Sequence, residues 1–192
     1  MLIRRITPYL LLGLLVISCQ SSKNDNIDVD KTKTQLSNHA NDFMMGLKSV
    51  LISNMKDGGP VNAVTVCADT AEQLTNMYSE SMGVTVKRFS FKNRNINNTP
   101  DSFEEKALIN FKELHKTGQL TDKSHVFEVT KDDVAKIVKP IMVGAPCLTC
   151  HGDKNQIDAE VAGIIMKKYP DDKAFGYKIG DLRGAISVSK IL

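Results

Sequence analysis

Residues 147–151 read Cys-Leu-Thr-Cys-His, and this C-x-x-C-H pattern is the most chemically specific feature of the sequence. Two thiols one helical turn apart can each form a thioether with a vinyl group of the same porphyrin. The next residue then brings an imidazole to the iron. The pattern therefore predicts one covalently attached c-type haem, held by Cys147 and Cys150, with His151 as the proximal iron ligand.

A structural zinc site is the alternative use of such a pattern. Zinc sites of this kind need about four ligands, usually from two Cys or His pairs of similar spacing. The sequence has four cysteines and four histidines, and His39, His115 and His125 are scattered singly. Haem attachment is therefore the favoured interpretation.

Residues 1–18 have the features of an export signal. Arg4 and Arg5 precede an apolar run from Leu10 to Ile17. This run is shorter than a permanent membrane-spanning helix requires. Its end, with Ser18 directly before Cys19, resembles a bacterial lipoprotein box. We expect cleavage before Cys19, lipidation of that cysteine and anchoring at a bacterial membrane, facing the periplasm or the cell surface. The alternative is an ordinary secretory peptide in which Cys19 has no special role.

The four cysteines are then almost fully assigned. One is lipidated and two hold haem, which leaves Cys67 and no structural disulfide. An unpaired cysteine in an oxidising compartment suggests burial or metal ligation.

Charge gives no evidence for a partner. Residues 1–18 contain two of the 25 basic residues and none of the 22 acidic ones, so the mature chain has a net charge of +1. A nearly neutral chain does not indicate binding to nucleic acid or to an anionic membrane surface.

The pattern of apolar residues predicts a flexible tether over residues 19–34 and a single domain over residues 35–192. Helical spacing is found from residue 36 until Gly58 and Gly59 stop it, over residues 60–83, from residue 100 to just before Gly118, and over residues 158–169. Cys67 lies on the apolar stripe of the second helix. Strands are expected over residues 84–91, 125–129, 134–142 and 183–191. Residues 92–99 are polar and should form a loop. The expected fold is α+β, an antiparallel sheet with helices on one face.

Four segments of the sequence resemble the PAS-like haem c-binding domains, which occur in bacteria as stand-alone exported proteins and as sensor regions of histidine kinases and chemoreceptors. The segments are residues 63–71, 91–103, 139–152 and 169–188. The resemblance covers nearly all of residues 35–192 and implies a PAS-like fold. It also implies a His and Cys pair on the iron, with His151 proximal and Cys67 distal. One departure is Ile96, where a proline is expected in the family.

Several assignments have alternatives. Cys67 could simply be a small hydrophobic residue of the core. Rival distal ligands are Met44, Met45, Met55, Met77, Met82, His39, His115 and His125. Arg88 and Arg94 are candidates for pairing with the haem propionates, since a guanidinium can hold a carboxylate with two hydrogen bonds. Arg183 could contact the haem edge or only begin a strand.

Three classes of function are compatible with these residues. The first is a redox-responsive or gas-responsive sensor that acts through a signalling partner. The second is a membrane-tethered electron carrier with a redox partner. The third is a peroxidase-like enzyme, which would need an acid or base such as His115 or His125 beside an open iron site. The sequence predicts no catalytic residue, so a non-enzymatic role is favoured.

Overall fold

The structure is a computed structural model that describes residues 28–192. The predicted export signal, Cys19 and the first part of the predicted tether lie outside these residues. Among the described residues, no helix combines the length and the apolar character needed to cross a membrane.

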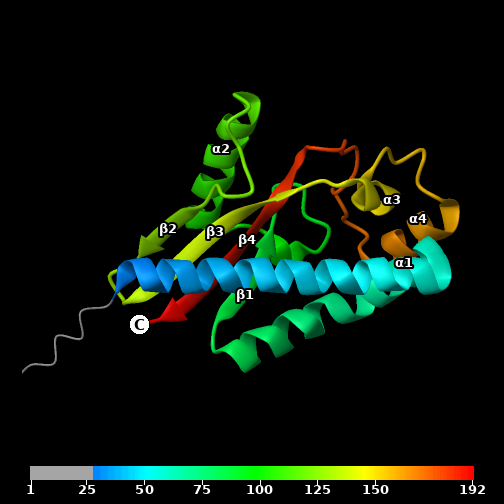
Figure 1. Ribbon diagram of the computed structural model, residues 1–192. Coiled ribbons are helices and arrows are strands. Elements are labelled where there is room, and N and C mark those ends of the chain that lie inside the picture. The colour runs from blue at the N-terminus through cyan, green and yellow to red at the C-terminus, as the bar shows by residue number, and fades with distance from the viewer. Residues whose placement is uncertain (1–27) are drawn as a thin grey trace, which may run out of the picture.

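The longest element, α1 (Val29–Met82), consists of two helical arms joined by a bend at Gly58 and Gly59. Gly59 has φ 72° and ψ −168°, a backbone conformation that is essentially restricted to glycine. Pro60 then opens the second arm, where its fixed φ suits a first helical turn. The two arms run back alongside one another (Figure 1). The sequence predicted them as two helices separated at this Gly-Gly-Pro segment.

The beginning of α1 differs from the prediction. The helix starts at Val29, inside the range 19–34 that was expected to be a tether. The Asp28 side chain accepts a hydrogen bond from the Lys31 N–H and caps the helix. This cap explains why the polar residues before position 35 are helical.

Four antiparallel strands form one sheet in the order β1-β4-β3-β2. The strands are β1 (Thr85–Phe89), β2 (Val126–Val129), β3 (Val134–Met142) and β4 (Leu182–Ile191). β4, the last strand of the chain, lies between β1 and β3. Its Ile186 is opposite Arg88 on one side and Lys139 on the other.

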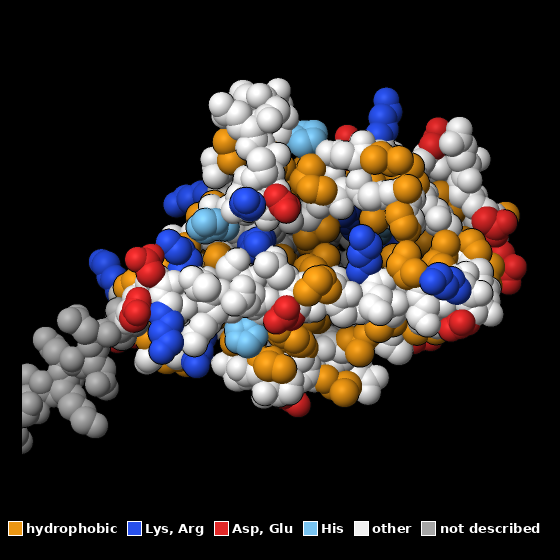
Figure 2. Space-filling model, in the orientation of Figure 1, with side chains coloured by type: hydrophobic (Ala, Val, Ile, Leu, Met, Phe, Trp, Pro, Cys, Tyr) orange, Lys and Arg blue, Asp and Glu red, His pale blue; other side chains and the backbone are white. Residues whose placement is uncertain are grey.

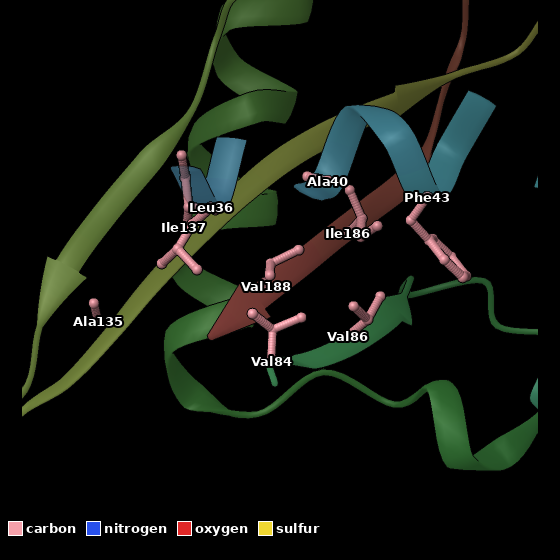
Figure 3. Packing of buried hydrophobic residues seen from close by; sticks show 9 residues of the cluster. All are labelled: Leu36, Ala40, Phe43, Val84, Val86, Ala135, Ile137, Ile186 and Val188. Carbon is pink, nitrogen blue, oxygen red and sulfur yellow. The ribbon is translucent and has the colours of Figure 1, made fainter. Parts of the chain in front are cut away.

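Helices cover both faces of this sheet, so the expectation that they lie on one face was wrong. On one face, Leu36, Ala40 and Phe43 of α1 pack against residues including Val86 and Ile186 (Figure 3). On the other face lies α2 (Ser102–Lys116). Its buried residues Ala107, Leu108 and Phe111 pack against Phe89, Val138 and Ala185. Residues 184–188 of β4 are all buried, as expected for a strand covered on both sides. This run contains glycine, alanine and serine, so hydrophobicity alone did not reveal it.

One carboxylate is fully enclosed on the α2 side of the sheet. Glu104 accepts hydrogen bonds from Ser187 (2.8 Å), Lys87 (2.7 Å) and the Asp101 N–H (2.9 Å). Lys136 is a further partner at 3.3 Å. These contacts join α2 to three strands.

The helices α3 (Leu148–His151) and α4 (Ala159–Lys168) lie at the end of the molecule where α1 bends (Figure 1). The 3-10 turn η2 (Ala145–Cys147) leads directly into α3, and the 3-10 turn η1 (Ile96–Asn98) follows β1. Val161 and Ile165 of α4 pack against Val64 in the second arm of α1. This contact holds the C-x-x-C-H segment beside that arm.

Candidate functional site

A cavity of about 490 Å³ lies between α1, the sheet and the C-x-x-C-H segment. Its size falls within the range of about 300–1,000 Å³ that is usual for pockets that hold small molecules and cofactors. Most of its wall is apolar, with residues such as Met44, Leu47, Leu51, Val64 and Ile141. Figure 2 shows a hollow between α1 and the loops near α3, with hydrophobic side chains around it.

Cys147, Cys150 and His151 all line this cavity. Cys147 ends η2 in a helical conformation and caps α3, so it lies three residues before Cys150 on the same side of the backbone. Gly152 ends this turn, and a Cβ atom there would lie 2.6 Å from the Leu148 carbonyl oxygen. A glycine is therefore needed directly after His151. Both thiols are free and half-buried.

The His151 ring is held in a defined tautomer by its hydrogen bond. Its Nδ1 lies 2.8 Å from the Ala174 carbonyl oxygen, which can only accept, so Nδ1 carries the proton. Arg94 Nη2, another donor, is 3.2 Å from the same nitrogen, so this second contact is electrostatic and not a hydrogen bond. Nε2 consequently keeps its lone pair, which is the form that binds a metal ion.

Burial, together with the charges of Arg94 and Arg183, lowers the pKa of His151 to about 3. The imidazole is therefore neutral over the whole physiological range. A neutral imidazole is the state required of a metal ligand.

Cys67 lies in the second arm of α1 and also lines the cavity. Burial raises the pKa of its thiol above the usual value, and the Arg88 guanidinium offsets only part of this effect. Val64, three residues earlier on the same helix face, belongs to the apolar cluster against which Cys150 packs. The structure thus brings the C-x-x-C-H segment against the face of α1 that carries Cys67.

Three arginines line the cavity, and they differ in their partners. Arg94 donates from Nε to Asp172 at 2.9 Å and from Nη2 to the Cys150 carbonyl oxygen at 2.5 Å. Arg183 donates to the Lys92 carbonyl oxygen at 3.1 Å and lies over the Tyr177 ring. Within residues 28–192, neither Arg88 nor Arg183 forms a salt bridge with a carboxylate. These two cations are thus available to an anionic group in the cavity.

Most of the rival distal ligands lie elsewhere. Met44 and Met45 line the cavity, whereas Met55, Met77 and Met82 do not. The three remaining histidines are also outside its lining and have other partners. His39 contacts the Tyr78 hydroxyl, His115 the Gly180 carbonyl oxygen and His125 the Lys123 carbonyl oxygen.

Sequence reasoning missed three residues of this region. Met142, at the end of β3, lines the cavity and was not considered as a ligand. Its position at the end of the strand that leads to the C-x-x-C-H segment could have indicated that it lies near the haem site. Asp172 and Ala174 hold Arg94 and His151, and no local pattern in the sequence indicates this.

The donor set fits an iron porphyrin better than it fits a metal ion alone. In the part of the chain that the structure describes, no three His, Cys, Asp or Glu side chains are grouped to hold a metal ion. The zinc alternative therefore gains no support. The paired thiols match the two vinyl groups of a porphyrin, and the neutral imidazole matches its iron. The apolar walls suit the porphyrin ring, and the two available arginines suit its propionates.

Comparison with known proteins places this chain in a family. A crystal structure of the cyanobacterial heme-protein Tll0287 matches with a TM-score of 0.63 and 25% sequence identity, over 82% of this chain and 93% of that one. A comparison with curated proteins gave no match. The model of the Tll0287-like family matches residues 21–190. The predicted family and the predicted α+β fold in a single domain are thereby confirmed. Because that match covers most of the sequence, this protein belongs to the Tll0287-like family.

Proposed function

We propose that this protein carries one haem, attached covalently in the cavity through Cys147 and Cys150. The observation that carries this proposal is that both thiols, together with the neutral His151, line one apolar cavity of about 490 Å³. The description of Tll0287 as a heme-protein supports it. We propose His151 as the proximal ligand and Arg88 and Arg183 as partners of the haem propionates, because neither arginine forms a salt bridge within residues 28–192. Arg94, the other predicted propionate partner, already donates from Nε to Asp172 and from Nη2 to the Cys150 carbonyl oxygen.

Cys67 is proposed as the distal ligand. A bound haem supplies an iron that changes between ferric and ferrous states and can bind small ligands. If haem is held by His151 and Cys67, the Cys67 thiolate would donate negative charge to the iron and favour the ferric state. Reduction would weaken the attraction for that thiolate, and burial favours the protonated thiol. Cys67 would then be the ligand that detaches on reduction, and the helix that carries it would be free to shift.

This behaviour suits a sensor of redox state or of a small gas, whose signal passes to a partner protein. The alternative is an electron carrier, in which Cys67 stays bound in both oxidation states. A peroxidase-like role depended on His115 or His125 beside the iron, and neither residue lines the cavity. In both favoured cases we propose that the protein is exported and anchored through a lipidated Cys19. Replacing Cys19 with Ala should release it from membranes.

Attachment is tested by producing the full chain in cells with an active cytochrome c maturation system and measuring its intact mass. Wild type should be coloured and heavier by one haem. The double variant Cys147→Ser/Cys150→Ser should lack this added mass of haem. The matched control Cys67→Ser removes the third cavity thiol and should keep covalent haem. A colourless wild-type protein with bare sulfhydryls would exclude the proposal.

Sensor and carrier are separated by optical spectra of the oxidised and the dithionite-reduced protein, with and without carbon monoxide. Carbon monoxide should change the spectrum of the reduced wild type if Cys67 detaches. The reduced Cys67→Ala variant should bind carbon monoxide as well, and His151→Ala should lose the spectral features that depend on histidine ligation of the iron. An unchanged reduced spectrum on adding carbon monoxide would favour the electron carrier.

A further inference from the structure

We propose that Asp172 and Arg94 form a clip that positions His151 and thereby sets the reduction potential of the site. This inference rests on the proposed haem. Asp172 and Arg94 are 78 residues apart in the sequence and form an ion pair at 2.9 Å. The Asp172 side chain is only 3% exposed. An ion pair this deeply buried beside a site residue requires an explanation, because burying charges is costly unless their geometry serves other contacts.

Both oxygens of the Asp172 carboxylate are used, and one of them leads to His151. Oδ2 accepts from Arg94 Nε, and Oδ1 accepts from the Ala174 N–H at 2.7 Å. The carbonyl oxygen of Ala174 in turn accepts from His151 Nδ1 at 2.8 Å. Asp172 thus fixes the residue whose carbonyl holds the imidazole.

Arg94 closes the clip from the other side. Its Nη2 donates to the carbonyl oxygen of Cys150, the residue directly before His151. The imidazole and the backbone that carries it are therefore both tied to the same ion pair. Backbone hydrogen bonds from Gly176 to Gly152 and from Tyr177 to His151 also join the two segments. Because these bonds do not involve side chains, the segments can stay together when Asp172 is replaced, and the change then falls on the His151 ring.

The clip lowers the reduction potential of the site in two ways. The hydrogen bond from Nδ1 increases the electron donation of the imidazole to a bound metal, which favours the oxidised state. The Asp172 carboxylate also balances the Arg94 cation, which is 3.2 Å from His151 Nδ1. Loss of the carboxylate weakens the first effect and leaves the cation unbalanced. Both changes favour the reduced state, so the potential should become more positive.

The test compares two buried carboxylates in the intact holoprotein. Asp172→Asn removes the charge and leaves an acceptor oxygen near the Ala174 N–H. Glu104→Gln removes a carboxylate that is 1% exposed and paired with Lys87, on the opposite side of the sheet from α1. Redox titration and the electron paramagnetic resonance spectrum of the ferric form are measured for both variants. We expect a more positive potential and altered g-values for Asp172→Asn, and wild-type values for Glu104→Gln. An unchanged potential in Asp172→Asn, or an equal shift in Glu104→Gln, would overturn the clip.

A measurement on wild type covers the case in which Asp172→Asn does not fold. The proton on His151 Nδ1 should give a hyperfine-shifted nuclear magnetic resonance signal that exchanges slowly with solvent, because Ala174 holds it. Exchange as fast as that of free imidazole would contradict the clip. These outcomes are separate from a failure of the proposed function, in which the wild-type chain itself carries no covalent haem.

Discussion

Asp172 and Glu104 are both buried carboxylates paired with cations, but their networks end differently. The contacts of Glu104 with Ser187, Lys87, Lys136 and the Asp101 N–H all lie within the sheet and the start of α2. The network of Asp172 ends at His151, whose Nε2 has no partner from this chain among residues 28–192. A network that is complete within the fold contributes to stability alone. One that ends on an available lone pair can also tune a ligand.

The apolar parts of the two regions show the same contrast. On the α2 side, Phe111 is fully buried among other core residues. At the other end, the apolar walls enclose a cavity of about 490 Å³. The α2 side of the sheet is thus closely packed, whereas the site near the bend of α1 is not filled by side chains. The stability and the spectrum of the protein should therefore respond differently to substitutions in the two regions.

The largest expected effect is that of Phe111→Ala on stability. Removing a fully buried aromatic ring should lower the free energy of unfolding by about 3–5 kcal/mol. Chemical denaturation of the holoprotein measures this loss. The optical spectrum of the folded variant should equal that of wild type, because Phe111 does not line the cavity. A changed spectrum would show that the two regions are not independent.

A smaller effect is expected from Gly59→Ala, which changes the bend that joins the two arms of α1. No atom lies within 4 Å of the added methyl group, so the cost is that of the backbone conformation, about 1–3 kcal/mol. Thermal unfolding should show a lower melting temperature. Gly46→Ala is the matched control, since its methyl group also meets nothing within 4 Å and Gly46 is inside a helical arm. This control should stabilise the protein by about 0.5–1 kcal/mol. Equal effects of the two variants would contradict the special role of the bend.

The smallest expected effect concerns Asp101, at the start of α2, and the loss of folding stability at acidic pH. Burial raises the pKa of Asp101, but hydrogen bonds from Lys136 and from the Glu104 N–H, together with the charges of Lys136 and Lys87, outweigh this effect, so the net pKa is below its usual value. A carboxyl with a lowered folded pKa contributes stability that is present above its unfolded pKa of about 3.9 and is lost as the pH falls through the folded pKa. Asp101→Asn keeps a good helix cap and removes this titration. Denaturation between pH 7 and pH 2 should show a shallower loss of stability below about pH 4. An unchanged slope would exclude a contribution from Asp101.

Much of the secondary structure could be predicted because local spacing determines it. The Gly-Gly-Pro segment divided the two arms of α1, and the pattern of apolar residues located α2, α4 and all four strands. The prediction failed at the start of α1, where a capping aspartate extends a polar helix. It also failed for the sheet, because the buried run of β4 contains small and polar residues that do not indicate two covered faces.

Residue types and their spacing identify the groups that can do chemistry: the two thiols and imidazole of the C-x-x-C-H segment, and Cys67 on an apolar helix face. The packing of the folded chain, in contrast, brings Cys67 and this segment to one cavity and brings Arg94 into contact with Asp172 and Cys150. The two differ because local conformation follows from neighbouring residues, whereas a contact across 78 residues depends on how the finished elements pack. Such a contact has no periodicity or spacing by which it could be found in the sequence.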